Sequence, residues 1–117
     1  MTQREPLLGL RHMLDAAREA VEAAAGLKAA DLENDRLREL ALERLLEILG
    51  EAAAQTPPEE RALHPEIPWN RIVGMRNEII HGYASVDPEI VLRTIRENLP
   101  PLIRQLETAL RAEGGAT

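Results

Sequence analysis

The apolar residues of this chain recur at helical spacing, in segments that prolines separate from one another. Hydrophobic residues make up 44% of the 117 residues but aromatic residues only 2%, so Leu, Ala, Ile and Val must form the core. The charged residues are 29% of the chain, mostly Glu and Arg, and complete a composition that favours helix. A chain of this length buries one core. The sequence therefore predicts a single all-α domain over residues 1–117, folded as a helical bundle.

Start and stop signals predict four main helices and a short one. Asp31 is the predicted cap of the second helix, and residues 56–59 have the spacing of a capping box for the short one. Asp87, which precedes a proline, starts the last helix, and we expect a break or kink near Pro100-Pro101. The predicted helices cover residues 5–25, 31–55, 56–63, 69–80 and 87–112, with a frayed tail at 113–117.

Each main helix is expected to carry one apolar face. On the first helix the face is Leu10, Leu14, Ala17, Val21 and Ala24. On the second it is Leu37, Leu40, Ala41, Leu45, Ile48, Leu49 and Ala52. On the third it is Trp69, Ile72, Val73, Ile79 and Ile80, and on the last it is Leu92, Ile95, Leu99, Leu102, Leu106 and Ala109.

Charge and cysteine content exclude several classes of function. The net charge of −6 excludes a basic surface over the whole chain, so any contact with RNA must use a local patch. The chain has no Cys, which excludes disulfides, thiolate metal sites and a Cys nucleophile. The N-terminal stretch "MTQREPLLGLRHML" has no long apolar run, so we expect neither a signal peptide nor a membrane span.

The segment "MRNEIIHGYASVDPEI" brings together Arg76, Asn77, His81 and the only Tyr, Tyr83. Arg76 lies on or beside the apolar stripe, where a guanidinium is costly unless it is paired or faces a cleft. Arg76 and His81 are about 140° apart on an ideal helix. We therefore expect the helix to end near Ile80, which lets both side chains face one cleft with Tyr83 at its rim.

These residue types suit cleavage of an RNA phosphodiester without a metal. A His transfers the proton of the ribose 2′-hydroxyl or of the leaving oxygen. An Arg stabilises the negative charge that develops on phosphorus. An Asn orients the phosphate or the imidazole, and a Tyr stacks on a base or donates a hydrogen bond.

Each of these residues also has a purely structural interpretation. The dipole of a helix favours a His such as His81 at its C-terminus. Arg76 can pair with Glu47 or Glu51 of the second helix, and Tyr83 can lie at the edge of the core. The spacing of Arg and His alone does not separate these alternatives.

The remaining histidines show no convincing spacing for a metal site. His12 lies on the first helix, where we expect it to be exposed, and His64 precedes a proline in the connector "HPEIPW". We find no pair of His, or of His with a carboxylate, at metal-ligand spacing. The sequence therefore predicts no metal site and no cofactor.

Three blocks of the chain resemble a known family. They are "LERLLEILGEAA", "HPEIPWNRIVGMRNEIIHGYASVDPEIV" and "ENLPPLIRQLE", and they span most of the chain between Asp31 and Glu107. They resemble the HEPN toxins of HEPN/MNT toxin–antitoxin systems, the HepT-like ribonucleases of bacteria and archaea. The resemblance implies a HEPN-type bundle that forms a homodimer, with the Arg–His motifs meeting in a cleft at the dimer interface.

The resemblance also implies roles for the residues singled out above. Arg76, Asn77 and His81 would perform metal-independent cleavage of RNA in a cytoplasmic protein. Tyr83 would accept AMP from a minimal nucleotidyltransferase, the antitoxin partner in a type VII-like system. The added negative charge beside Arg76 and His81 would then block RNA.

Two further expectations concern RNA binding and the alternative function. In a dimer we expect Arg71 and Arg76 to bind RNA, with Arg93 or Arg96 in the same cleft; dispersed Arg side chains would contradict this. The alternative is a HEPN module with weak catalysis that mainly holds the nucleotidyltransferase, which the acidic net charge favours. A purely structural bundle is the third possibility, and the placement of Arg76 argues against it.

Overall fold

The computed structural model describes residues 4–82 and 86–114, and the regular structure of these residues is entirely helical. The elements are α1 (Arg4–Ala24), α2 (Ala29–Glu33), α3 (Arg36–Ala54), α4 (Pro58–Leu63), α5 (Trp69–Gly82), α6 (Pro88–Arg93), the π-helical turn η2 (Thr94–Asn98) and α7 (Leu99–Gly114). The prediction of an all-α bundle is confirmed. No helix in the described ranges is long and apolar enough to cross a membrane.

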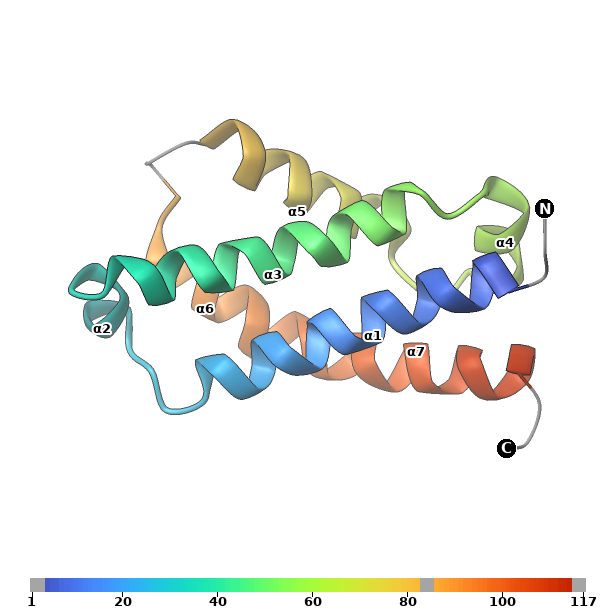
Figure 1. Ribbon diagram of the computed structural model, residues 1–117, viewed down its shortest axis with the longest axis horizontal. Helices are drawn as coiled ribbons and strands as arrows, with labels where there is room; N and C mark the ends of the chain where they lie inside the picture. Colours follow the sequence, from blue (N-terminus) through green and yellow to red (C-terminus); the bar gives the residue numbers. More distant parts are fainter. Residues whose placement is uncertain (1–3, 83–85, 115–117) are drawn as a thin grey trace.

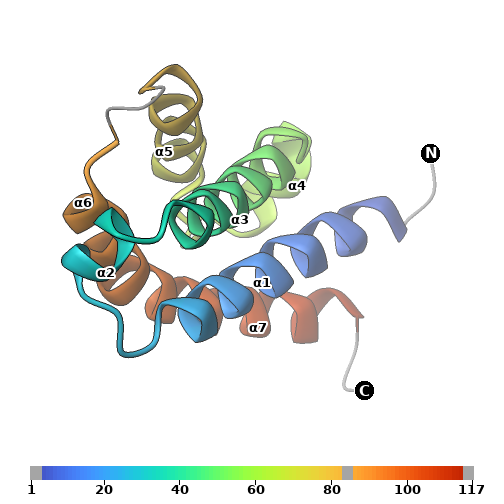
Figure 2. The same cartoon turned by 60° about the vertical axis from the view of Figure 1, so that its left-hand side comes forward.

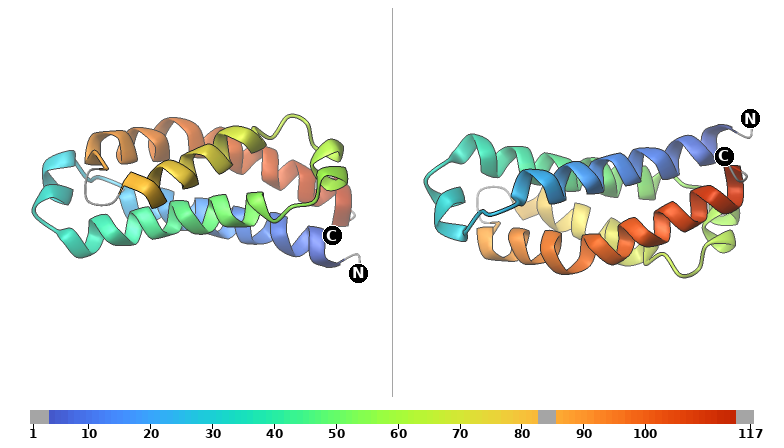
Figure 3. Two further views of the ribbon diagram at one scale, coloured as in Figure 1. Left: turned by 90° about the horizontal axis from the view of Figure 1, so that it is seen from above. Right: turned by 90° about the horizontal axis from the view of Figure 1, so that it is seen from below.

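The bundle is built around α1 and α3 (Figure 1). One side of α1 packs on α3 and another packs on α7, while α5 packs on the far side of α3. The segments α6, η2 and α7 follow one another as a single rod, here called the C-terminal rod (Figure 3). Viewed from the side, α5 rests on α3 and stands apart from this rod (Figure 2).

The first helix forms as predicted. It spans Arg4–Ala24, and the chain leaves it at Gly26, whose φ of +77° is a left-handed conformation that favours glycine. Leu10, Leu14, Ala17 and Ala24 of the predicted face are buried, and the core also takes in Met13, Ala16 and Ala20.

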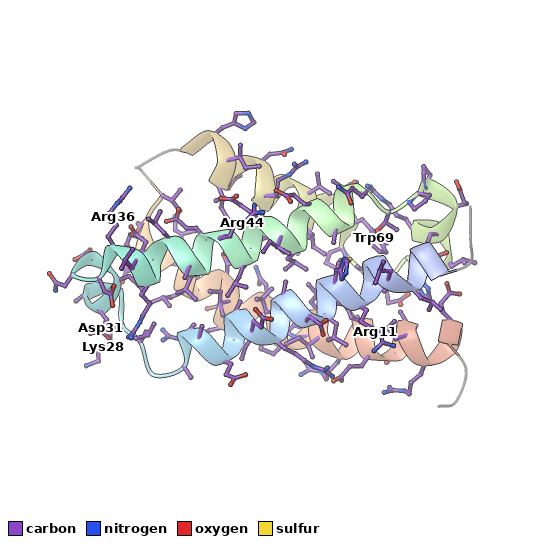
Figure 4. The ribbon with its side chains drawn as sticks, in the orientation of Figure 1. Arg11, Lys28, Asp31, Arg36, Arg44 and Trp69 are labelled. Carbon is purple, nitrogen blue, oxygen red and sulfur yellow. The ribbon has the colours of Figure 1, made fainter. Side chains whose placement is uncertain are left out.

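The predicted second helix is divided, and its predicted cap is wrong. Asp31 lies inside the short helix α2, where its Oδ2 accepts a hydrogen bond from the backbone N–H of Lys28 at 2.7 Å (Figure 4). The long helix α3 is capped instead by Asp35, whose Oδ1 accepts from the N–H of Arg38 at 3.1 Å. The predicted end of the helix is confirmed, since α3 stops at Ala54.

The predicted apolar face of α3 is also wrong in part. Leu37 is 81% exposed and Leu40 is 42% exposed, whereas the helix buries Leu42, Leu46, Leu49 and Ala53. The Leu-rich helix carries two adjacent apolar stripes, and periodicity alone does not choose between them. The packing of α1 and α5 on α3 selects the second stripe.

The short helix α4 forms, but the predicted capping box does not. Thr56 is buried, and its hydroxyl donates back to the carbonyl of Ala52 at 2.9 Å rather than capping α4. Pro57 occupies the cap position, and Pro58 is the first helical residue. Arg61 ties this corner to α3 by donating to the carbonyls of Thr56, Ala53 and Ala54.

The C-terminal rod confirms the predicted start and the predicted break. The Oδ1 of Asp87 accepts from the N–H of Glu89 at 2.9 Å and caps α6. The break lies one turn before the prolines, as the wide turn η2. Pro100 and Pro101 clash with the carbonyls four residues earlier and cannot donate to them, and both carbonyls lie in η2.

The face of the rod is buried as predicted, at Leu92, Ile95, Leu99, Leu102, Leu106 and Ala109. The predicted frayed tail begins too early, because α7 continues through Glu113 to Gly114. Residues 115–117 lie outside the described residues.

Candidate functional site

The helix α5 carries the predicted catalytic residues, and it is longer than predicted. It continues to Gly82, so His81 lies in its last turn rather than in a loop. The predicted apolar side is correct for Trp69, Ile72 and Ile79, which are buried, but Ile80 is 40% exposed. The expectation that the helix ends near Ile80 is therefore wrong, and Arg76 and His81 remain about 140° apart around a continuous helix.

Arg76 is held at the closest approach of α5 to α3. A Cβ on Gly50 would overlap the Cβ of Arg76 and would lie 2.7 Å from its Cγ. Only glycine allows this contact, which presses the stem of Arg76 against α3. The Nε of Arg76 is buried there and has no hydrogen-bond partner among the described residues. A buried donor without an acceptor costs free energy.

The alternative ion pair of Arg76 with Glu47 or Glu51 of α3 is not found among the described residues. Arg44, on α3 itself, engages both candidate carboxylates, at 3.2 Å from Glu47 and 3.3 Å from Glu51 (Figure 4). Within the described part of the chain, the alternative explanation of Arg76 as a structural partner of these two residues is therefore wrong.

His81 is exposed, and one of its ring nitrogens is fixed. Its Nδ1 lies 2.8 Å from the backbone carbonyl of Asn77, one helical turn earlier. A carbonyl only accepts, so Nδ1 must carry the proton and donate it. In the neutral ring the lone pair is then on Nε2, which is left for another proton donor. The side chain of Asn77 is exposed on the same side of the helix.

Tyr83, the predicted site of AMP transfer, lies outside the described residues. The last described residue before it is Gly82, at the end of α5. The chain is described again from Val86, which is half-buried and packs against the core.

A groove of about 840 Å³ separates α5 from the C-terminal rod. Arg71, Met75 and Glu78 line one wall, Ile90 and Thr94 are among the residues of the other, and the floor includes Leu46 and Leu49. Arg76, Asn77 and His81 do not line it. Arg71 therefore faces the groove, whereas Arg76 lies on another side of α5 from Asn77 and His81.

The other two arginines named from the sequence are placed elsewhere. Arg93 and Arg96 line a separate small depression beside Ala29. Arg96 donates to the carbonyls of Ala24 and Leu27, and so closes the C-terminal end of α1. The structure thus separates the predicted RNA-binding arginines within one chain, and Arg96 has a structural partner.

Two features of α3 were missed by sequence reasoning. Gly50 is a lone glycine inside a Leu-rich helix, a position that signals a close contact. Glu43 is buried on the same face, seven residues earlier. Burial raises the pKa of the Glu43 carboxyl above its usual value, and the charges of Glu39 and Glu47 raise it further, against a lowering by Arg36.

The expectation that no His has a convincing carboxylate partner is also wrong. His64 is buried, and its ring nitrogens lie within 4 Å of carboxylate oxygens of Glu60, Glu66 and Glu113. The sequence signal was the spacing of four residues between Glu60 and His64, which lie at the two ends of one helical turn. Glu113 is brought in only by the fold.

The all-α bundle and its exposed histidine define a helical protein with a polar site on one outer helix, and comparison with known proteins names its family. A model of the family described as Ribonuclease HepT-like matches residues 13–109, and the chain belongs to this family. No solved structure matches the chain significantly.

Several proteins with similar sequences have names that also refer to a ribonuclease. A protein of Caldanaerobacter subterraneus named "Putative RNase TTE0752" is 36% identical over 104 residues, which are 89% of this chain and 93% of the relative. "Probable ribonuclease HepT" of Thermococcus cleftensis is 40% identical over 73 residues, 62% of this chain and 66% of the relative. "Putative RNase MJ1380" of Methanocaldococcus jannaschii is 28% identical over 107 residues, 92% of this chain and 98% of the relative.

Proposed function

We propose that this chain is the toxin of a toxin–antitoxin pair, a metal-independent endoribonuclease whose site forms between two copies of the chain. The family and its relatives support ribonuclease activity in general. The observation that carries the finer proposal is the arrangement of α5. One helix carries Arg76, whose buried Nε has no hydrogen-bond partner among the described residues, on one side and a His81 with a fixed tautomer on another.

The angle between these two side chains favours a dimer. Since α5 is continuous, Arg76 and His81 of one chain point about 140° apart. A two-fold axis beside α5 would place His81 of one protomer near Arg76 of its partner, and would do so twice. The surface between them suits such a contact, because Val73 is half-buried and Ile80 is 40% exposed.

The proposed reaction uses the 2′-hydroxyl of the RNA as nucleophile. Its oxygen attacks phosphorus, the bond from phosphorus to the 5′-oxygen breaks, and the 5′-oxygen leaves with a proton. His81, through Nε2, accepts the first proton or delivers the second. Arg76 stabilises the extra negative charge on the phosphoryl oxygens. Asn77 fixes the imidazole through its carbonyl, and Arg71 binds the RNA away from the scissile bond.

Regulation is proposed to act on the same site. A nucleotidyltransferase antitoxin transfers AMP from ATP to the phenol oxygen of Tyr83, with release of pyrophosphate. Tyr83 is two residues beyond His81 in sequence, so the attached phosphate would add negative charge close to the proposed site. Intact mass and peptide mapping after incubation with the antitoxin and ATP test this step; unchanged mass with an active antitoxin contradicts it.

Mixing two inactive variants tests the composite site most directly. His81→Ala and Arg76→Gln each inactivate both sites of a homodimer, and Gln keeps part of the stem that packs on Gly50. After random exchange of chains, half of the dimers are mixed and each carries one site with both residues intact. The mixture should therefore recover about a quarter of the unaltered activity. Absence of recovery, with exchange confirmed by mass, contradicts a site shared between chains.

The alternative function is a module that holds the nucleotidyltransferase and cleaves RNA weakly or not at all. The net charge of −6 and the acidic outer residues of α3 favour it. It predicts that any residual RNA cleavage by the purified protein is the same in the unaltered chain and in His81→Ala, while both variants still bind the nucleotidyltransferase.

A further inference from the structure

A second cluster of chemical groups lies at the other end of α5, where the chain enters that helix. Glu60 is in α4, His64 follows the end of α4, and Glu113 is in the last turn of α7. The Nε2 of His64 is 3.7 Å from Oε1 of Glu60 and 3.8 Å from Oε2 of Glu113. One donor atom from each residue lies within 4.8 Å of the other two. Figure 1 shows α4 and the end of α7 at the same end of the bundle.

Glu60 and His64 of this cluster are buried, and one polar atom of each has no hydrogen-bond partner among the described residues. Glu60 is only 7% exposed and His64 only 5%. The Oε1 of Glu60 and the Nε2 of His64 have no hydrogen-bond partner among the described residues, although each points into the space that Glu113 also faces. Buried polar atoms are costly when unsatisfied, and two carboxylates in one buried site also repel each other. A cation among the three residues would remove both costs.

The backbone of His64 is held in place from outside the cluster. The backbone carbonyl of His64 accepts a hydrogen bond from the indole Nε1 of Trp69 at 3.0 Å and another from the N–H of Ile67 at 3.2 Å. The guanidinium of Arg61 lies 5.8 Å above the Trp69 ring. On the other side of the imidazole, Nδ1 is 3.9 Å from Oε2 of Glu66. This arrangement resembles the carboxylate that orients a metal-bound histidine through its second nitrogen.

We propose that Glu60, His64 and Glu113 bind a divalent transition metal of the zinc class, which joins α4 to the end of α7. Ligand atoms around tetrahedral Zn²⁺ are about 3.3 Å apart, so the separations of 3.7 and 3.8 Å from Nε2 of His64 need only a small contraction, and the three atoms lie within 4.8 Å of one another. One imidazole nitrogen with two carboxylates suits Zn²⁺ better than Mg²⁺, which prefers six oxygens. Glu113 is 24% exposed, so a water from that side completes the coordination.

The charges at the site agree with this assignment. Two carboxylates and a neutral imidazole balance the two positive charges of the ion. In the metal-free chain, burial raises the pKa of Glu60 to about 7, and the hydrogen bond and charge of Glu113, with the charge of Glu59, act in the same direction. A proton shared between Glu60 and Glu113 would relieve the same repulsion without metal, and the experiment must separate these two cases.

The site is a structural one, separate from the proposed RNA site. It includes none of Arg71, Arg76, Asn77 or His81, and its ligands come from α4, the connector and α7. Bound metal would fix the connector that leads into α5 against the end of the C-terminal rod. Metal binding at this cluster can therefore be tested independently of ribonuclease activity.

The test uses the full chain, first treated with EDTA and then dialysed. Titration with ZnCl₂ near neutral pH, followed by calorimetry, should show one ion per chain, and thermal unfolding should show a Tm raised by several degrees because the metal binds only the folded cluster. MgCl₂ should give neither effect. Glu60→Gln and Glu113→Gln should each weaken Zn²⁺ binding about tenfold or more. Glu59→Gln changes an exposed neighbour on the same helix and should bind as the unaltered chain does.

Two results would overturn the proposal. Equal Zn²⁺ affinity in Glu60→Gln, Glu113→Gln and the unaltered chain would show that the ion binds elsewhere. No Zn²⁺ binding by the unaltered chain would also overturn it, and a higher Tm of Glu60→Gln in EDTA would then identify a pair of carboxyls that share a proton. RNA cleavage measured in the same samples reports on the proposed function separately, since EDTA should leave it unchanged.

Discussion

A histidine and a buried glutamate lie toward each end of α5, and the two pairs differ in what surrounds them. At the beginning of the helix, His64 is buried and both of its nitrogens face carboxylates. At the end of the helix, His81 is exposed and a backbone carbonyl holds one nitrogen. A buried ring among carboxylates suits a fixed ligand, whereas an exposed ring with one free nitrogen suits proton transfer. We therefore propose a different chemistry for each of these two histidines, on the basis of its surroundings.

The buried glutamates differ in the same way. Glu60 has His64 as a neighbour, which can share a cation with it. Glu43 is on the face of α3 that carries Gly50, and since α3 and α5 run in opposite directions, it lies toward the end of α5 (Figure 1). Burial raises the pKa of the Glu43 carboxyl, and the charges of its acidic neighbours Glu39 and Glu47 raise it further. The carboxyl of Glu43 therefore lies among acidic neighbours, with Arg36 acting against them, whereas Glu60 faces a histidine.

The largest expected effect is the loss of activity in His81→Ala. Removal of a general acid or base should lower the rate of RNA cleavage about 10²–10⁴-fold, with Tm unchanged because the side chain is exposed. His12→Ala, an exposed histidine on α1, is the matched control and should keep full activity. If His64→Gln stays folded and loses RNA cleavage to the same extent, the two histidines do not differ in role as proposed.

Gly50→Ala should be the most destabilising substitution near Arg76. The added Cβ overlaps Arg76, so α5 must move away from α3, at a cost of about 1–3 kcal/mol in the free energy of unfolding. Gly74→Ala is the control on α5, where a Cβ meets nothing within 4 Å. It should stabilise the helix by about 0.5–1 kcal/mol. Urea unfolding of both variants measures the difference, and equal stabilities would contradict the close contact.

Arg61→Ala should loosen the end of the molecule with His64. The substitution removes three hydrogen bonds to carbonyls at the end of α3 and the contact over Trp69, at a cost of about 2 kcal/mol. Arg104→Ala, an exposed arginine on α7, should change the stability by less than about 0.5 kcal/mol. If RNA cleavage by Arg61→Ala falls as much as by His81→Ala while the protein stays folded, the two ends are coupled.

The smallest effect is expected for Glu43→Gln. The pKa of Glu43 is raised on folding, so its contribution to stability is greatest at low pH and is lost as the pH rises through the raised pKa. Gln does not ionise, so the Glu43→Gln variant does not lose this stability as the pH rises. The variant should have a free energy of unfolding near pH 7 that is higher by an amount of the order of 1 kcal/mol. The gain should vanish below about pH 4, where the carboxyl is protonated in both states. A gain that is independent of pH would contradict a buried charge as its cause.

Helical spacing and proline positions predicted most of the fold. The buried faces of α1 and the C-terminal rod were predicted correctly because each has one apolar stripe. The pair Pro100-Pro101 predicted the break in the last helix. The face of α3 was wrong because that helix has two stripes, and Leu37 belongs to the one that stays exposed. Arg76 could be singled out as a charge beside an apolar stripe, but its contact with Gly50 depends on how closely two helices approach.

The sequence by itself determined that the chain is helical, where most helices begin and end, and which short segment carries Arg76, Asn77 and His81. Local propensity, capping and periodicity suffice for this, since they act within a few residues. Tertiary structure alone decided that His81 stays on a continuous helix turned away from Arg76, and that Glu113 reaches His64 across 49 positions of the chain. Burial and long-range proximity arise from packing between helices, which no local pattern specifies.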